Sequence, residues 1–125
     1  MRRSASGQPP SGAGTDAHRV MSYNPFVALQ WLLDGKTTGG TPLRRSDEIP
    51  SRQEALRLYT SGSAWLDHSE RRRGTLEAGK LADLAVLSKD YLRVPVDEIG
   101  GIESLLTMVG GRIVYAAGPF QKLAE

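Results

Sequence analysis

The residues with the clearest chemical potential lie near the N-terminus, in the stretch GTDAH at positions 14 to 18. A carboxylate at the end of a strand, beside a flexible glycine, can bind a divalent metal and accept a proton from the metal's water. Asp16 is therefore the candidate catalytic residue and metal ligand. The alternative is a plain turn or cap, because aspartate favours such positions on backbone grounds alone.

Other chemistry-bearing groups give weaker signals. His18 and His68 are the two histidines of the chain, and a metal site would require them to converge with further ligands. The arginine run at 71–73 could contact phosphate, but acidic neighbours and the lack of interleaved aromatics favour a solvated loop. Gly79-Lys80 resembles a phosphate-binding loop only superficially, because Leu81 stands where a hydroxyl residue would bind magnesium.

Composition limits the classes of protein to which the chain can belong. The 125 residues suit one domain. The net charge of +2 is too small to indicate a nucleic-acid-binding protein. The absence of cysteine excludes disulfides, thiolate metal sites and a cysteine nucleophile. With no signal-peptide pattern and no apolar run long enough for a membrane span, we expect a soluble cytoplasmic protein without nucleic-acid or membrane partners.

Two helices are predicted to follow a disordered N-terminal segment, residues 1–13, which is rich in Gly, Pro and Ser. The first helix covers residues 25 to 34, with Asn24 as its N-cap and Gly35 at its end. The second begins at a capping box formed by Ser51 and Glu54. It extends towards residue 66, with a break expected at Gly62.

The second half of the chain predicts strands. The run KLADLAVLS, residues 80 to 88, is typical of a buried strand. Residues 104 to 115 form the clearest hairpin pattern, because Gly110-Gly111 suits a two-residue primed turn. Residues 96 to 103 are a polar connection of undetermined structure. Asp83, flanked by apolar residues, is predicted to be structural and to accept hydrogen bonds from backbone N–H groups or pair with a neighbouring base.

Taken together, these segments resemble the C-terminal end of the metal-dependent amidohydrolase superfamily, within its amidohydrolase 3 group. The resemblance runs from about Gly14 to Phe120, and its most specific part is GKLADLAVL followed by VGGRIVY. It implies an α/β fold: the last helices of a TIM-like (β/α)8 barrel plus the C-terminal strands of an accessory β-sandwich. Residues 14–70 would then end the barrel, and residues 71–125 would belong to the composite sandwich.

The resemblance also implies a chemistry. Members hydrolyse carbon-nitrogen bonds other than peptide bonds in small amide-type substrates, with water activated by a divalent metal, typically zinc. By this likeness Asp16 matches the aspartate after the eighth strand, which binds metal or shuttles a proton. His18 and Arg19 would lie on the substrate side of the same loop.

The departures from the family pattern lead to a second hypothesis. The histidine pair and the other metal ligands that the family carries on earlier strands are not found in this sequence, and the segment before Gly14 is too polar for a buried strand. We therefore expect an incomplete fragment that binds metal weakly and is inactive alone. The alternative is a non-catalytic remnant that oligomerises or docks onto a partner through exposed apolar helix faces.

Overall fold

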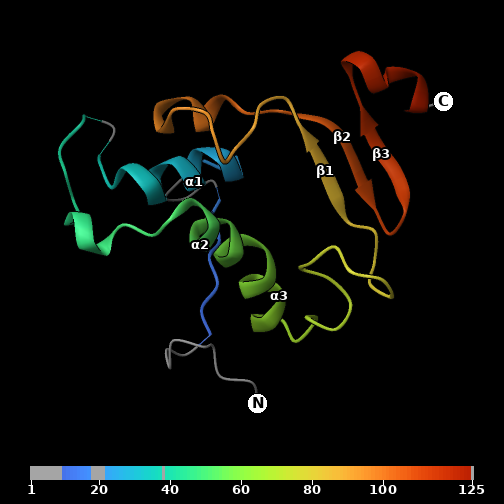
Figure 1. Cartoon of the computed structure of the whole chain (residues 1–125), viewed down its shortest axis with the longest axis horizontal. Coiled ribbons are helices and arrows are strands. Elements are labelled where there is room, and N and C mark those ends of the chain that lie inside the picture. The colour runs from blue at the N-terminus through green and yellow to red at the C-terminus, as the bar shows by residue number, and fades with distance from the viewer. Residues whose placement is uncertain (1–9, 18–21, 38, 125) are drawn as a thin grey trace.

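The computed structural model describes residues 10–17, 22–37 and 39–124. Three α-helical segments come first in the chain and an antiparallel sheet follows, so the fold is of the mixed α/β class that the sequence predicts. Figure 1 shows the helices gathered on one side and the sheet on the other, with the segment between β1 and β2 returning to the helices. Short 3-10 turns cover Ser46–Glu48, Val96–Gly101 and Gly118–Ala124.

Helix α1, Pro25–Asp34, begins and ends where its capping residues predict. The side chain of Asn24 accepts a hydrogen bond of 2.9 Å from the N–H of Phe26. Gly35 adopts the left-handed conformation, with φ of 62°, and its N–H donates to the carbonyl of Trp31 at 3.0 Å. Such a left-handed C-terminal residue satisfies a carbonyl that the last turn leaves open.

The second helical region confirms the predicted capping box but not the predicted break. Helix α2, Arg52–Arg57, starts at Ser51, whose hydroxyl accepts from the N–H of Glu54 while the Glu54 carboxylate accepts from the N–H of Ser51. The expected break at Gly62 is wrong. The chain passes through one π turn, Leu58–Gly62, into helix α3, Ser63–Leu66. Gly62 itself has helical dihedrals, with φ of −65°.

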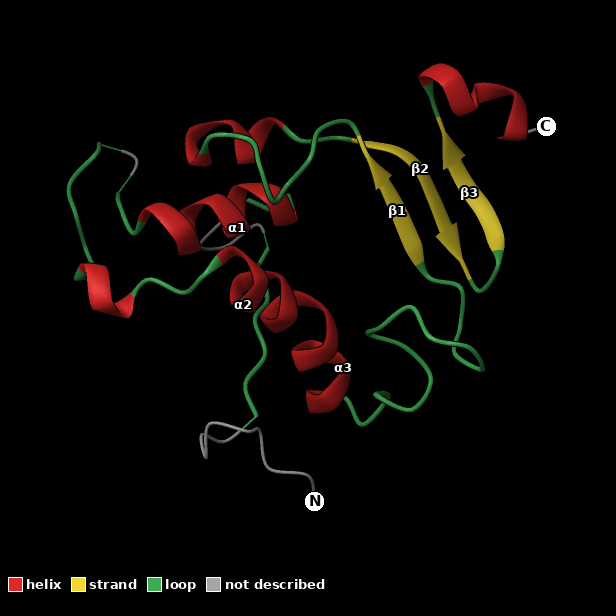
Figure 2. Ribbon diagram, in the orientation of Figure 1, coloured by secondary structure: helices red, strands yellow, loops and turns green. Residues whose placement is uncertain are grey.

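The sheet has three antiparallel strands in the order β1-β2-β3 (Figure 2). Their bounds are Leu84–Leu87, Ser104–Val109 and Arg112–Ala116, so the first strand starts later than KLADLAVLS predicts. The predicted hairpin is confirmed. Gly110 and Gly111 both have positive φ, 56° and 80°, which a two-residue primed turn requires.

The best-sealed core lies between α1, α2 and the connector, our name for residues 88–103. Tyr91, Ile99 and Ile102 of the connector are at most 5% exposed, and they pack with Leu29, Leu33 and Ala55 of the helices. The expectation that the helix faces lack a partner within the chain is therefore wrong for these helix residues. Trp31, by contrast, keeps 38% of its surface exposed.

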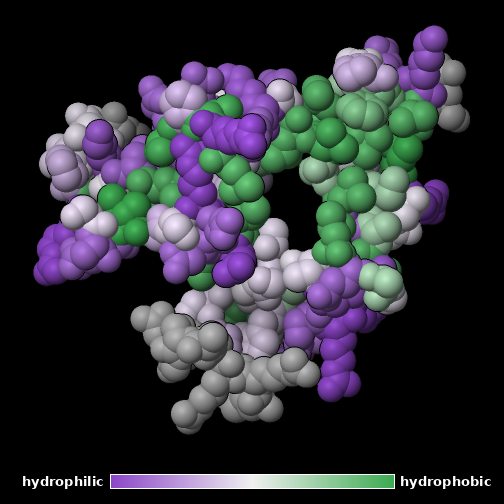
Figure 3. All heavy atoms as spheres, in the orientation of Figure 1, coloured by the Kyte–Doolittle hydropathy of each residue, from purple (hydrophilic) through white to green (hydrophobic). Residues whose placement is uncertain are grey.

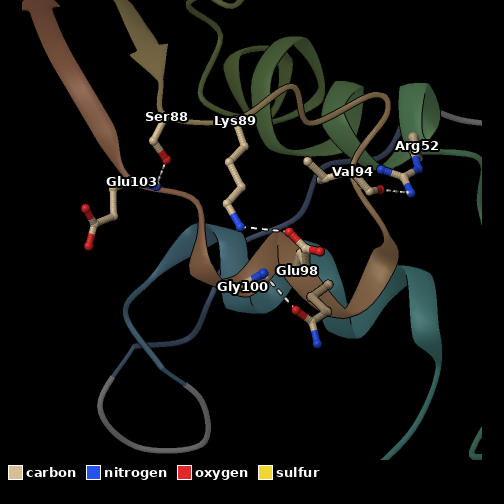
Figure 4. A network of polar contacts seen from close by, with 8 residues as sticks. Arg52, Ser88, Lys89, Val94, Glu98, Gly100 and Glu103 are labelled. Atoms are coloured by element: carbon tan, nitrogen blue, oxygen red, sulfur yellow. Dashed lines mark hydrogen bonds and ion pairs between the residues drawn. The ribbon is translucent and has the colours of Figure 1, made fainter. Parts of the chain in front are cut away.

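Polar contacts hold the connector in place on both helices (Figure 4). Arg52 donates to the carbonyls of Tyr91 and Val94 at 2.6 and 2.5 Å, and the Tyr91 hydroxyl donates back to the Arg52 carbonyl at 2.9 Å. The N–H of Gly100 donates to the side-chain oxygen of Gln30 on α1 at 2.7 Å. The connector therefore belongs physically to the helical part, although it lies beyond residue 70, where a domain boundary was predicted.

The sheet is less enclosed than the helices. Strand alternation and register place six apolar side chains on one face, yet only Leu106 among them is buried. In Figure 3 apolar surface covers the sheet, and open space separates it from the helices. The six apolar residues on this face of the sheet are Leu84, Val86, Leu106, Met108, Ile113 and Ala116.

Within the described ranges, no helix has the length and apolar character needed to cross a membrane.

Candidate functional site

Asp16 lies in a short segment that runs alongside the second helical region. Its side chain is exposed, and its backbone is left-handed, with φ of 48°. Aspartate tolerates this conformation better than most residues, because its short polar side chain can bond locally. His18 and Arg19, the other predicted site residues, lie outside the described residues.

The segment before Asp16 is held by hydrogen bonds to the π turn. We call residues 11–14 the strap. The N–H of Ala13 donates to the carbonyl of Leu58 at 2.9 Å. The Ser63 hydroxyl is 2.8 Å from the carbonyl oxygen of Ala13 and 2.9 Å from that of Leu58, so these two acceptors share one proton. The Tyr59 hydroxyl donates to the Gly14 carbonyl at 3.3 Å.

These contacts concern part of the segment that was predicted to be disordered. Residues 10–13 belong to that segment, yet Ala13 donates one backbone hydrogen bond and accepts another. Residues 1–9 lie outside the described part of the chain. A π turn places carbonyls out of the regular helical ladder, which explains how Leu58 can accept from a segment distant in sequence.

Gly62 and Gly74 lie where backbone segments approach each other closely. We call the place where the strap passes the π turn the crossing. A Cβ added to Gly62 would lie 2.2 Å from the carbonyl oxygen of Ser11, which is too close for any non-bonded contact. A Cβ on Gly74, on the other flank of the π turn, would lie 2.7 Å from the Cβ of Ala64 and 3.0 Å from the Cα of Ser61. The run of small residues from 60 to 64, TSGSA, is the sequence signal that could have indicated this crossing.

Near the crossing, burial raises one pKa and a hydrogen bond lowers another. Partial burial raises the pKa of the Tyr59 hydroxyl above its ordinary value. At the end of α3, the Ser69 hydroxyl lowers the pKa of Asp67. His68 is exposed in the same turn, with a left-handed φ of 59°.

The described residues do not form a metal centre. Within them, no three His, Cys, Asp or Glu side chains gather closely enough to hold a metal ion. Catalytic metal sites in proteins take about three protein ligands, whereas the described part of this segment offers the single carboxylate of Asp16. The arginine run at 71–73 is exposed, as a solvated loop requires.

Asp83 has the structural role that the sequence predicts. Its side chain is half-buried and accepts a hydrogen bond of 2.7 Å from the N–H of Gly110 in the hairpin turn. The N–H of Gly111 donates to the carbonyl of Ala82 at 3.1 Å. Asp83 therefore ties the start of β1 to the β2–β3 turn, and it faces no candidate catalytic group among these contacts.

Comparison with known proteins identifies the family to which the chain belongs. The model of the amidohydrolase family, in its amidohydrolase 3 form, matches residues 6–115. Because the match covers most of the sequence, the chain belongs to the amidohydrolase family. No solved structure gives a significant match.

Two curated relatives agree with this assignment. An N-substituted formamide deformylase from Arthrobacter pascens is 33% identical over 98 residues, which are 78% of this chain and 18% of that protein. A Bacillus subtilis (strain 168) protein with the provisional name amidohydrolase YtcJ is 31% identical over 105 residues, 82% of this chain and 20% of its own length. The chain thus spans about a fifth of the length of the curated relatives it matches.

Proposed function

We propose that this chain contributes the Asp16 loop to a hydrolase that acts on carbon-nitrogen bonds other than peptide bonds. The observation that carries the proposal is the family match over residues 6–115, which includes Asp16 and the π turn that holds the preceding strap. Family membership supports hydrolysis of C–N bonds in general. The name of the Arthrobacter pascens relative suggests small amides, such as N-substituted formamides, as the first substrates to test.

In this proposal the chain's own residues supply position and one carboxylate. Asp16 would bind metal or move a proton to the leaving nitrogen, while His18 and Arg19 would face the substrate. When a divalent metal is bound, it would supply the activated water, as the family implies. Because one described carboxylate does not make a metal centre, the other ligands must come from outside the described residues. We therefore propose that this polypeptide alone is inactive.

A chimera tests the proposal. Residues 6–115 of this chain, the range that matches the family, would replace the equivalent segment of the Arthrobacter pascens deformylase, and formate release from an N-alkyl formamide would be measured. We expect activity in the chimera and its loss with Asp16→Asn. Asp97→Asn, at an exposed position of the connector, is the matched control and should retain activity. A folded chimera that is inactive, or one in which both substitutions behave alike, would contradict the proposal.

The non-catalytic alternative stays a prediction, but the surface expected to mediate self-association is now the sheet and not the helix faces. The sheet exposes several apolar side chains, with Val114 at 61% and Val109 at 54%, whereas Leu29 and Leu33 of α1 are buried under the connector. Self-association, if measured, would therefore be expected at the sheet and not at the face of α1 that the connector covers.

A further inference from the structure

We propose that the π turn Leu58–Gly62, together with Ser63, is a positioning device for Asp16, an inference that rests on the proposed function. Ser63 and Tyr59 do not touch the carboxylate. They bond the carbonyls of Ala13 and Gly14, which lie three and two residues before it. Three residues of extended chain span at most about 11 Å, so anchoring Ala13 confines the volume that Asp16 can reach.

The device has three components that act on the same short segment. The backbone bond from Ala13 to Leu58 sets the register between the strap and the helix. The Ser63 hydroxyl bridges the same two residues from the side-chain direction. Gly62 allows the contact, because any side chain there would collide with the Ser11 carbonyl. Bonds to both the N–H and the carbonyl of Ala13 make this residue the fixed point of the strap.

Glycine at position 62 is informative because it makes the helix around it less stable than alanine would. Glycine within a helix is less favourable than alanine, so Gly62→Ala should strengthen the helical region by itself. A chain selected only for helix stability gains nothing from glycine at this position. The crossing of the strap supplies the physical reason for keeping it.

The test compares Gly62→Ala with Gly14→Ala in the full chain. A Cβ at Gly14 would meet no atom within 4 Å and its φ is not left-handed, so this variant adds the same methyl group to the strap without a collision. Amide exchange at Ala13 and the steady-state ¹H–¹⁵N NOE at Asp16 would be measured by NMR. In Gly62→Ala we expect Ala13 to exchange about tenfold faster, as for the loss of one hydrogen bond, and the Asp16 NOE to fall.

Ser63 provides a second variant pair that does not depend on a collision. Ser63→Ala removes the hydroxyl and should loosen the strap in the same direction, whereas Ser63→Thr keeps a hydroxyl and should restore both readouts. Far-UV circular dichroism checks that the helices remain in every variant. The inference is overturned if Asp16 keeps its order in both Gly62→Ala and Ser63→Ala, or if Ser63→Thr behaves as alanine does. None of these readouts depends on catalysis, so they are independent of the chimera experiment.

Discussion

The helical part buries its apolar face, whereas the sheet leaves much of its apolar surface exposed. In the helical part, Leu29, Ala55, Ile99 and Ile102 are at most 2% exposed, because the connector folds back over α1 and α2. In the sheet, Val109, Val114 and Tyr115 each expose more than half of their surface. The difference shows that this chain supplies its own partner for the helices but not, among its described residues, an equivalent cover for the sheet.

The largest effect expected from this comparison is at Ile99. Ile99→Ala removes a fully buried side chain at the centre of the helical core, and we expect the free energy of unfolding to fall by about 2–5 kcal/mol. Val114→Ala, at an exposed sheet position, should lower it by less than about 1 kcal/mol. Urea unfolding followed by circular dichroism measures both. Equal losses would mean that the two parts do not differ in enclosure.

A second experiment removes the polar tie between connector and α2. Arg52→Met deletes the donors to the carbonyls of Tyr91 and Val94 in a half-buried setting, which we expect to cost about 1.5–3 kcal/mol of unfolding free energy. Arg93→Met is the matched control. Its side chain is 88% exposed and pairs with Asp90 on the surface, where removal of the pair should change stability by less than about 1 kcal/mol. A small Arg52 effect would mean that apolar packing alone holds the connector.

Leaving the control variants aside, the smallest of the three effects is expected on the sheet side, at Asp83. Asp83→Ala removes the acceptor for the Gly110 N–H, so we expect a loss of about 1 kcal/mol and faster amide exchange at Gly110. Asp83→Asn keeps a side-chain oxygen and should recover most of the protection. Hydrogen exchange followed by NMR distinguishes the two variants. If Asp83→Ala left Gly110 protected, the tie between β1 and the hairpin would not depend on this carboxylate.

Local chemistry explains which elements the sequence could predict. The ends of α1, the capping box of α2 and the Gly110-Gly111 turn each depend on residues within a few positions of one another. Such features can be recognised from the sequence without knowing the rest of the fold. The role of Asp83 was predicted in kind, because a half-buried carboxylate requires hydrogen-bond donors.

The features that sequence reasoning missed depend on contacts between distant positions. Gly62 suggested a helix break, but the helical region continues through it. A side chain at this position would collide with the carbonyl of Ser11, which is far away in the sequence. Residues 96–103 of the connector were predicted as a polar connection, although Ile99 and Ile102 are almost completely buried. For the candidate site, Asp16 could be named from its motif, while its support from Ser63 and Tyr59 could not.

The contact between Arg52 and the connector has one more consequence. The bonds from Arg52 to Tyr91 and Val94 join positions 39 and 42 residues apart, so they close a long ring of the polypeptide. Small proteins often achieve such a closure with a disulfide, which restricts the entropy of the unfolded chain. This sequence has no cysteine, and its ring is closed by hydrogen bonds from a guanidinium group, which form in the folded state and leave the unfolded chain unconstrained. The closure should therefore withstand reducing agents, and it should weaken when guanidinium salts compete for the same carbonyls.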